Sequence, residues 1–200
     1  MMVVGEGDTD LPYLRKLADD AGLPATSDID AGGKGNIDRD LAKYNAMGKS
    51  LPLLVVRDLD RDAKCAGELV SGMRRKPARW FRFRLAVREL ESWVLADAVG
   101  LARFLGVEKK WIPEDPDSEA DPTQSLLAVA GRAPAQMRRK LLPEKGNTAV
   151  VGPLYEATLI EFGTRVWSAA RASERSPSLR RARVALEILA RDWRRYVSTD

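Results

Sequence analysis

Two aspartates that follow a short apolar segment near the middle of the chain have the spacing of a metal site. The apolar run 53–56 ends before Arg57, and Asp58 and Asp60 follow with one residue between them. Such a run predicts a strand buried on both faces of a parallel sheet, and open α/β sheets bind ligands at the carboxyl ends of their strands. Side chains two residues apart in an extended segment point the same way, so both carboxylates can reach one cation. A solvated acidic turn is the plainer alternative.

Other acidic residues occupy comparable strand-to-helix junctions. Glu6 lies between two glycines, directly after an expected strand over residues 2–5. Glu89 and Glu91 follow another expected strand and open a helix, although acidity in a first helical turn is also common without function. If these strands are neighbours, Glu6 and Glu91 converge with the aspartate pair on one edge of the sheet, and Glu89 replaces Glu91 if the helix begins elsewhere.

The amino-acid composition limits the kinds of catalytic and metal site that the chain can form. The chain has no histidine and one cysteine, Cys65, which excludes Ser-His and Cys-His nucleophiles, a histidine base, ordinary Cys/His zinc sites and an internal disulfide. Any metal must therefore be held by oxygen, which favours Mg²⁺ or Mn²⁺. We also expect a cytoplasmic protein without membrane association, because the chain has no apolar run of spanning length and its start lacks the features of a signal peptide.

The net positive charge is concentrated in the last part of the chain. Residues 121–200 hold 14 Lys and Arg against 8 Asp and Glu, whereas residues 1–120 hold 19 against 21. An acidic part followed by a basic part suits a polyanionic substrate, and ordinary surface solubility is the alternative. Arg138, Arg139 and Lys140 lie together in an expected helix and are candidate phosphate contacts.

Two further cations lie near the acidic residues. Lys34 belongs to a glycine-rich loop over residues 32–36, whose backbone amides could hold a phosphate, but no Gly-Lys-Ser/Thr sequence completes a P-loop. Arg57 stands directly before the aspartate pair. It is a candidate either for a salt bridge to an aspartate or for a phosphate contact.

The pattern as a whole predicts an α/β fold with a mainly parallel sheet flanked by helices, followed by a helical C-terminal part. We expect a core over residues 1–100 and a helical extension over 101–200 that packs on it. Alternation over residues 79–87 predicts an edge strand with one buried face and a solvated face that includes Trp80. The expected strands cover 2–5, 25–31, 53–56 and 79–87, and the expected helices 11–21, 37–47, 63–73, 88–97, 101–105, 121–130, 134–142, 154–172 and 179–196.

Several of these residues carry a family resemblance. Glu-Gly-Asp-Thr-Asp at 6–10, with Asp58-Leu-Asp60 after an apolar strand, resembles the Toprim pattern. The segment 89–97, with Ser-Pro-Ser at 176–178, is similar to the bacterial family called domain of unknown function 4276. That family is Toprim-like, related to nucleases of the overcoming-lysogenization-defect type, and its members often accompany ATPases in defence-associated gene clusters.

The resemblance implies roles for the acidic residues. Glu6 takes the place of the Toprim glutamate, a general base or acid or a metal ligand. Asp58 and Asp60 take the place of the pair that binds magnesium, and Glu91 looks like the family's extra acidic residue.

We therefore expect a metal-dependent nuclease that cleaves phosphodiester bonds, with DNA favoured over RNA, and that acts in phage or plasmid defence beside an ATPase partner. Two alternatives stay open. One is a haloacid-dehalogenase-like phosphatase with Asp58 as nucleophile, although that family places its Asp-x-Asp after the first strand. The other is a non-catalytic Toprim-like subunit that regulates a partner or binds nucleic acid.

Overall fold

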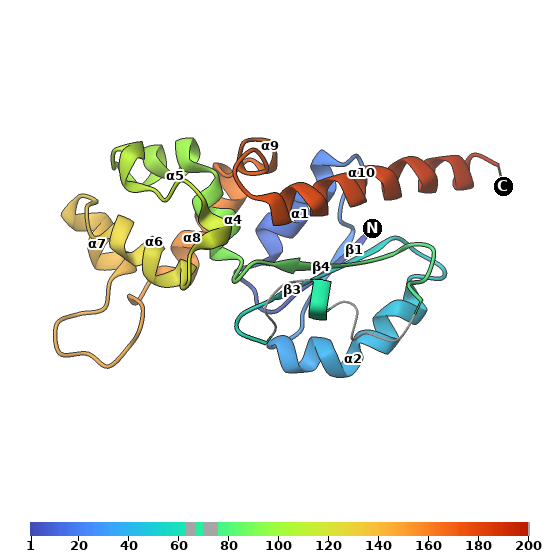
Figure 1. The fold of residues 1–200 in the computed structure, drawn as a ribbon, viewed down its shortest axis with the longest axis horizontal. Helices are drawn as coiled ribbons and strands as arrows, with labels where there is room; N and C mark the ends of the chain where they lie inside the picture. The colour runs from blue at the N-terminus through green and yellow to red at the C-terminus, as the bar shows by residue number, and fades with distance from the viewer. Residues whose placement is uncertain (63–66, 70–75, 200) are drawn as a thin grey trace.

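The computed structural model describes residues 1–62, 67–69 and 76–199 and has a four-stranded, all-parallel sheet with helices on both faces (Figure 1). This confirms the predicted α/β class and the parallel sheet. The strand order is β2-β1-β3-β4. The strands are β1 Met2–Gly5, β2 Ser27–Asp30, β3 Leu53–Asp58 and β4 Phe81–Ala86.

The strand order places the point of reversal between β1 and β3. From β1 the chain moves to one side to form β2 and then crosses to the other side to form β3, with Val4 opposite Val55 in the pairing of β1 with β3. Connections leave these two strands in opposite directions, which opens a crevice at their carboxyl ends, where doubly wound sheets bind ligands. Glu6 directly follows β1, and Asp58 is the last residue of β3.

Alternate residues of β3 are buried in different cores. Leu54 packs in the core formed with α1 (Leu11–Asp20) and α10 (Pro177–Val197), which cover one face of the sheet (Figure 1). Val55 packs in the smaller core formed with α2 (Lys34–Met47) on the opposite face. The continuous apolar run was therefore a correct indication of a strand buried on both sides.

The edge strand β4 differs from the prediction of one solvated face. Trp80, just before this strand, is only 3% exposed because α10 covers it. Its ring lies 5.0 Å from Trp193 and 5.3 Å from Tyr196, measured between ring centroids. The helix predicted from its apolar stripe therefore supplies the second layer, which the alternation in the strand alone did not reveal.

The remaining helices form a group beside the carboxyl edge of the sheet (Figure 1). They are α4 Glu91–Ala96, α5 Ala98–Leu105, α6 Pro122–Ala130, α7 Ala135–Leu141, α8 Tyr155–Arg165 and α9 Ala169–Ala172, with short 3-10 turns at Lys109–Trp111 and Pro116–Ser118. The helix predicted over 154–172 is wrong as a single element. It is interrupted at 166–168, where Trp167 is fully buried and the Ser168 side chain caps α9.

Two other predicted helices are not reproduced with the predicted bounds in the described structure. The helix expected over 63–73, which includes Cys65, lies largely outside the described residues. The helix expected over 37–47 begins earlier, at Lys34, so Lys34 belongs to the first turn of α2 and not to a loop. Gly32 and Gly33 precede it with φ values of +70° and +107°, which side chains rarely adopt.

One apolar core connects the sheet to the C-terminal helices. It extends without interruption from Val3 in β1 to Ala190 in α10. The division into a core over 1–100 and an extension over 101–200 remains a prediction. Within the described ranges, no helix combines the length and the hydropathy that a membrane crossing requires.

Candidate functional site

Glu6 and Asp58 meet at the carboxyl ends of the two central strands. The Glu6 Oε1 atom accepts a hydrogen bond of 2.8 Å from the backbone N–H of Asp58. Burial raises the pKa of Glu6, and the carboxylates of Asp10 and Asp60 raise it further, against the lowering effect of the Asp58 amide and Arg57. Glu6 therefore holds a proton more readily at neutral pH than an exposed glutamate does.

Asp10 belongs to the same cluster, although it was not among the predicted site residues. Its side chain does not cap α1. Instead, Oδ2 accepts hydrogen bonds from the backbone amides of Glu6, at 2.7 Å, and Gly7, at 3.3 Å. Burial is the main reason why the pKa of Asp10 rises to about 6, with Asp30 adding to it. A side chain at Gly5 would meet the Cβ of Asp10 at 2.7 Å, so Gly5 permits this close approach.

Asp58 carries the least compensated carboxylate of the cluster. Its main-chain N–H and C=O are bonded to Glu6 and Arg57, but its side chain accepts no hydrogen bond from any residue that the structure describes. Burial raises the pKa of Asp58 well above its usual range, and the neighbouring carboxylates of Asp10, Glu6, Glu91 and Asp60 raise it further, in that order. A carboxylate in this position favours either a proton or a bound cation.

Glu91 reaches the cluster from the first turn of α4, as predicted. Its Oε1 accepts a hydrogen bond of 3.1 Å from the Tyr155 hydroxyl. Burial raises the pKa of Glu91 to about 7, and Glu89 and Asp10 contribute to the rise. Glu89 itself points elsewhere, because its Oε2 accepts hydrogen bonds from the amide and hydroxyl of Thr123, at 3.1 and 2.8 Å.

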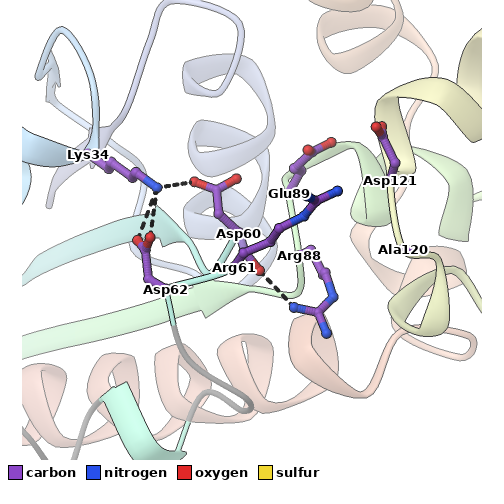
Figure 2. Close-up of a pocket in the computed structure, with 8 residues that line it drawn as sticks. All are labelled: Lys34, Asp60, Arg61, Asp62, Arg88, Glu89, Ala120 and Asp121. Carbon is purple, nitrogen blue, oxygen red and sulfur yellow. Dashed lines mark hydrogen bonds and ion pairs between the residues drawn. The ribbon is translucent and has the colours of Figure 1, made fainter.

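The Asp60 side chain is paired with a lysine. Its backbone adopts φ +47°, a left-handed conformation that aspartate tolerates better than most residues. Lys34 Nζ lies 2.7 Å from Asp60 Oδ2 and 3.0 Å from Asp62 (Figure 2). The lysine predicted to contact phosphate therefore neutralises two aspartates of the site in this structure.

Arg57 is likewise engaged, and it takes the first of its two predicted alternatives, the salt bridge. Its side chain is 4% exposed and bonds Asp38 at 2.8 and 2.9 Å and Asp62 at 2.6 Å. The partners are thus Asp38 and Asp62, and not the carboxylates of the predicted metal pair. A buried guanidinium held by two carboxylates favours the salt bridge over the phosphate contact.

The basic residues of α7 lie apart from the cluster. Arg138 and Arg139 are exposed, Lys140 is half-buried, and one Arg138 guanidinium nitrogen donates to the carbonyl of Ala133 at 2.9 Å. The helix occupies the end of the molecule remote from the sheet (Figure 1). Their contact with nucleic acid stays a prediction.

The donor chemistry of the cluster fits a hard divalent cation, although no ready-made cage is present. All the side chains offer oxygen, and the Asp58 carboxylate lacks a donor among the described residues. Within ranges 1–62, 67–69 and 76–199, no three Asp, Glu, Cys or His side chains already converge in the geometry of a metal site. The reason is visible in the contacts: Glu6 and Asp10 are bonded to backbone amides and Asp60 to Lys34.

A shallow pocket of about 430 Å³ lies beside this cluster (Figure 2). Asp60 and Lys34 line it on one side, and Glu89 and Asp121 on the other. No family model, curated protein or solved structure matches the chain. The site is therefore interpreted from its own geometry.

Proposed function

We propose that the chain is a Mg²⁺- or Mn²⁺-dependent nuclease that hydrolyses phosphodiester bonds of nucleic acid, with a Toprim-like core. The observation that supports it best is the carboxylate of Asp58, which lacks a hydrogen-bond donor in the described structure and lies among four other acidic side chains at the switch point of the sheet. A bound divalent ion would offset this crowding of like charges.

The contacts of each acidic residue suggest its role in binding the metal or in moving a proton. Asp58 would hold the ion, with Asp60, Glu6 and Glu91 as further ligands, and Asp10 lies close enough to assist. Bound there, Mg²⁺ or Mn²⁺ supplies polarisation of a phosphoryl oxygen and a more acidic water. Glu6 is also the candidate for moving a proton, because burial raises its pKa while the Asp58 amide fixes the position of its Oε1 atom.

The resemblance to Toprim-like proteins suggests the substrate, the location and the partner. We favour DNA over RNA, a cytoplasmic location, and an ATPase encoded nearby as partner in phage or plasmid defence. Glu89 is left out of the ligand set, because its carboxylate is engaged by the first turn of α6.

The test is cleavage of plasmid DNA, single-stranded DNA and RNA by the purified chain with Mg²⁺, Mn²⁺ or excess chelator. We expect cleavage with either metal, none with chelator, and none for Asp58→Asn. Asp20→Asn, a change at an exposed residue of α1, serves as the matched control and should keep full activity.

Two outcomes would contradict the proposal. Full cleavage in excess chelator would exclude the metal mechanism. Equal cleavage by wild type and Asp58→Asn would show that the activity does not belong to this site.

A further inference from the structure

The pocket beside Asp60 contains two arginines that the acidic residues do not neutralise. Arg61 makes no hydrogen bond or ion pair within the described part of the chain. Arg88 donates one hydrogen bond, of 2.8 Å, to the backbone carbonyl of Asp60, and forms no ion pair with a described residue. They differ in this respect from Lys34 and Arg57, whose charges are taken up by aspartates.

The two arginines lie in segments that follow different strands, and both line the same pocket. Arg61 belongs to the turn after β3, and Arg88 to the segment between β4 and α4 (Figure 2). The bond from Arg88 to the main chain of Asp60 ties it to the residue whose carboxylate is a candidate metal ligand. A group held by the arginines therefore lies beside the acidic cluster.

The wall of the pocket formed by Glu89 and Asp121 limits which ligands the pocket can bind. Glu89 accepts from the amide of Thr123, and Asp121 from the amide of Gln124 at 2.8 Å, so both carboxylates cap the first turn of α6. Their negative charge repels a second phosphate group. The eight described lining residues include no aromatic side chain on which a base would stack.

We propose that this pocket is a subsite for one backbone phosphate of nucleic acid, held by Arg61 and Arg88 without regard to base sequence. The inference rests on the proposed function and adds to it the residues that position the substrate. Guanidinium groups suit the task because their planar donors match phosphate oxygens in pairs.

The test is binding of fluorescent oligothymidylate and oligoadenylate in Ca²⁺, with salt concentration varied. Changing both Arg61 and Arg88 to Ala should weaken binding roughly tenfold or more and lower the salt slope by about 0.7, because each phosphate neutralised on a single strand contributes about 0.7. The loss should be equal for the two oligonucleotides. A double change to Lys should keep most of the salt slope but bind more weakly than wild type.

Two controls separate this effect from general loss of charge or of fold. The double variant Arg103→Ala, Arg165→Ala removes the same charge from exposed positions on α5 and α8 and should bind as wild type. Thermal unfolding should give the same midpoint for all variants, and Mn²⁺ binding should be unaffected by the Arg61 and Arg88 changes.

The outcomes also distinguish this inference from the proposed nuclease activity. If wild type binds through Arg61 and Arg88 but never cleaves, the nuclease proposal fails and the subsite stands. The subsite is wrong if the double Ala variant keeps wild-type affinity and salt slope, if the loss depends on base identity, or if wild type does not bind either oligonucleotide.

Discussion

The Glu6 side chain is bonded to the main chain of Asp58, with 2.8 Å between Oε1 and the amide nitrogen. This bond joins the ends of β1 and β3 across the switch point of the sheet. Glu6 thus supports the local structure through one carboxylate oxygen and is also the candidate proton-transfer group, so substitutions can separate the two roles.

We expect Glu6→Gln to fold like wild type and to lose cleavage, because the amide oxygen still accepts the Asp58 bond while the proton-transfer group is lost. Glu6→Ala should in addition lower the free energy of unfolding by about 1–3 kcal/mol, since the Asp58 amide loses its partner. Urea denaturation measures the difference. Equal stability of the two variants would show that the bond contributes nothing.

Asp58→Asn should make the metal-free protein more stable. The change removes the carboxylate whose pKa burial and four acidic neighbours raise, and with it their repulsion. A gain on the order of 1 kcal/mol would raise the thermal midpoint by roughly 2–4 °C for a chain of this size. The same variant should lose Mn²⁺ binding in calorimetry. Unfolding of Asp58→Asn, or unchanged Mn²⁺ binding, would contradict a metal site at this residue.

The metal-free protein should also lose stability as pH rises. In the folded chain, burial raises the pKa of Asp10 from 3.8 to about 6 and that of Glu91 from 4.5 to about 7. Between the unfolded and the folded pKa of each group, the folded state holds more protons than the unfolded state. The stabilisation that these protons give to the folded chain is therefore complete below pH about 4, and it is lost as the pH rises to about 7. For Glu91 alone the loss is on the order of 2–3 kcal/mol.

Comparing variants isolates the contribution of Glu91. Denaturation in chelator at several pH values should show a weaker decline for Glu91→Gln than for wild type. Glu174→Gln, at an exposed position, should follow wild type. If the free energy of unfolding of wild type falls with pH no more steeply than that of Glu91→Gln, then ionisation of the buried Glu91 carboxylate does not destabilise the fold.

The sequence predicted the sheet well because apolar runs and strand-to-helix junctions are local signals. Glu6, Asp58 and Glu91 could be placed at one edge for the same reason. Asp10 was missed as a site residue because an aspartate before a helix ordinarily caps it, and only the folded turn shows its oxygen bonded back to Glu6. The partners of Arg57, distant in sequence, were equally invisible.

Long-range packing explains the other differences. The helix break at Trp167 contains no proline or glycine, so the sequence gives no local signal for it. The break occurs because the Trp167 indole is buried and donates a hydrogen bond to the carbonyl of Trp93 at 2.9 Å. The two short segments used for the family resemblance, 89–97 and 176–178, prove to be in contact. Trp93 Nε1 donates to Ser178 Oγ at 2.7 Å.

Ser178→Ala should destabilise the protein without changing the acidic site. The serine is buried, and its loss leaves the Trp93 N–H without this acceptor, at a cost of about 1–3 kcal/mol. Ser198→Ala, at the exposed end of α10, should change the free energy of unfolding by about 0.5 kcal/mol or less. Chemical denaturation provides both values, and equal effects would mean that the buried hydrogen bond is not important for stability.

Lys34→Met should tighten Mn²⁺ binding. The ammonium group occupies Asp60 and Asp62 at 2.7 and 3.0 Å, so an ion that uses Asp60 must compete with it. Ion pairs of partly exposed side chains contribute about 0.2–1 kcal/mol, which predicts a dissociation constant lower by roughly 1.4- to fivefold. Lys43→Met removes a charge from an exposed position of the same helix and should leave the constant unchanged. Calorimetric titration in the absence of nucleic acid measures the Mn²⁺ dissociation constant of wild type and both variants.

Weaker or unchanged Mn²⁺ binding in Lys34→Met would show that Asp60 is not a ligand. The ion would then have to be held by Asp58 with Glu6, Asp10 or Glu91.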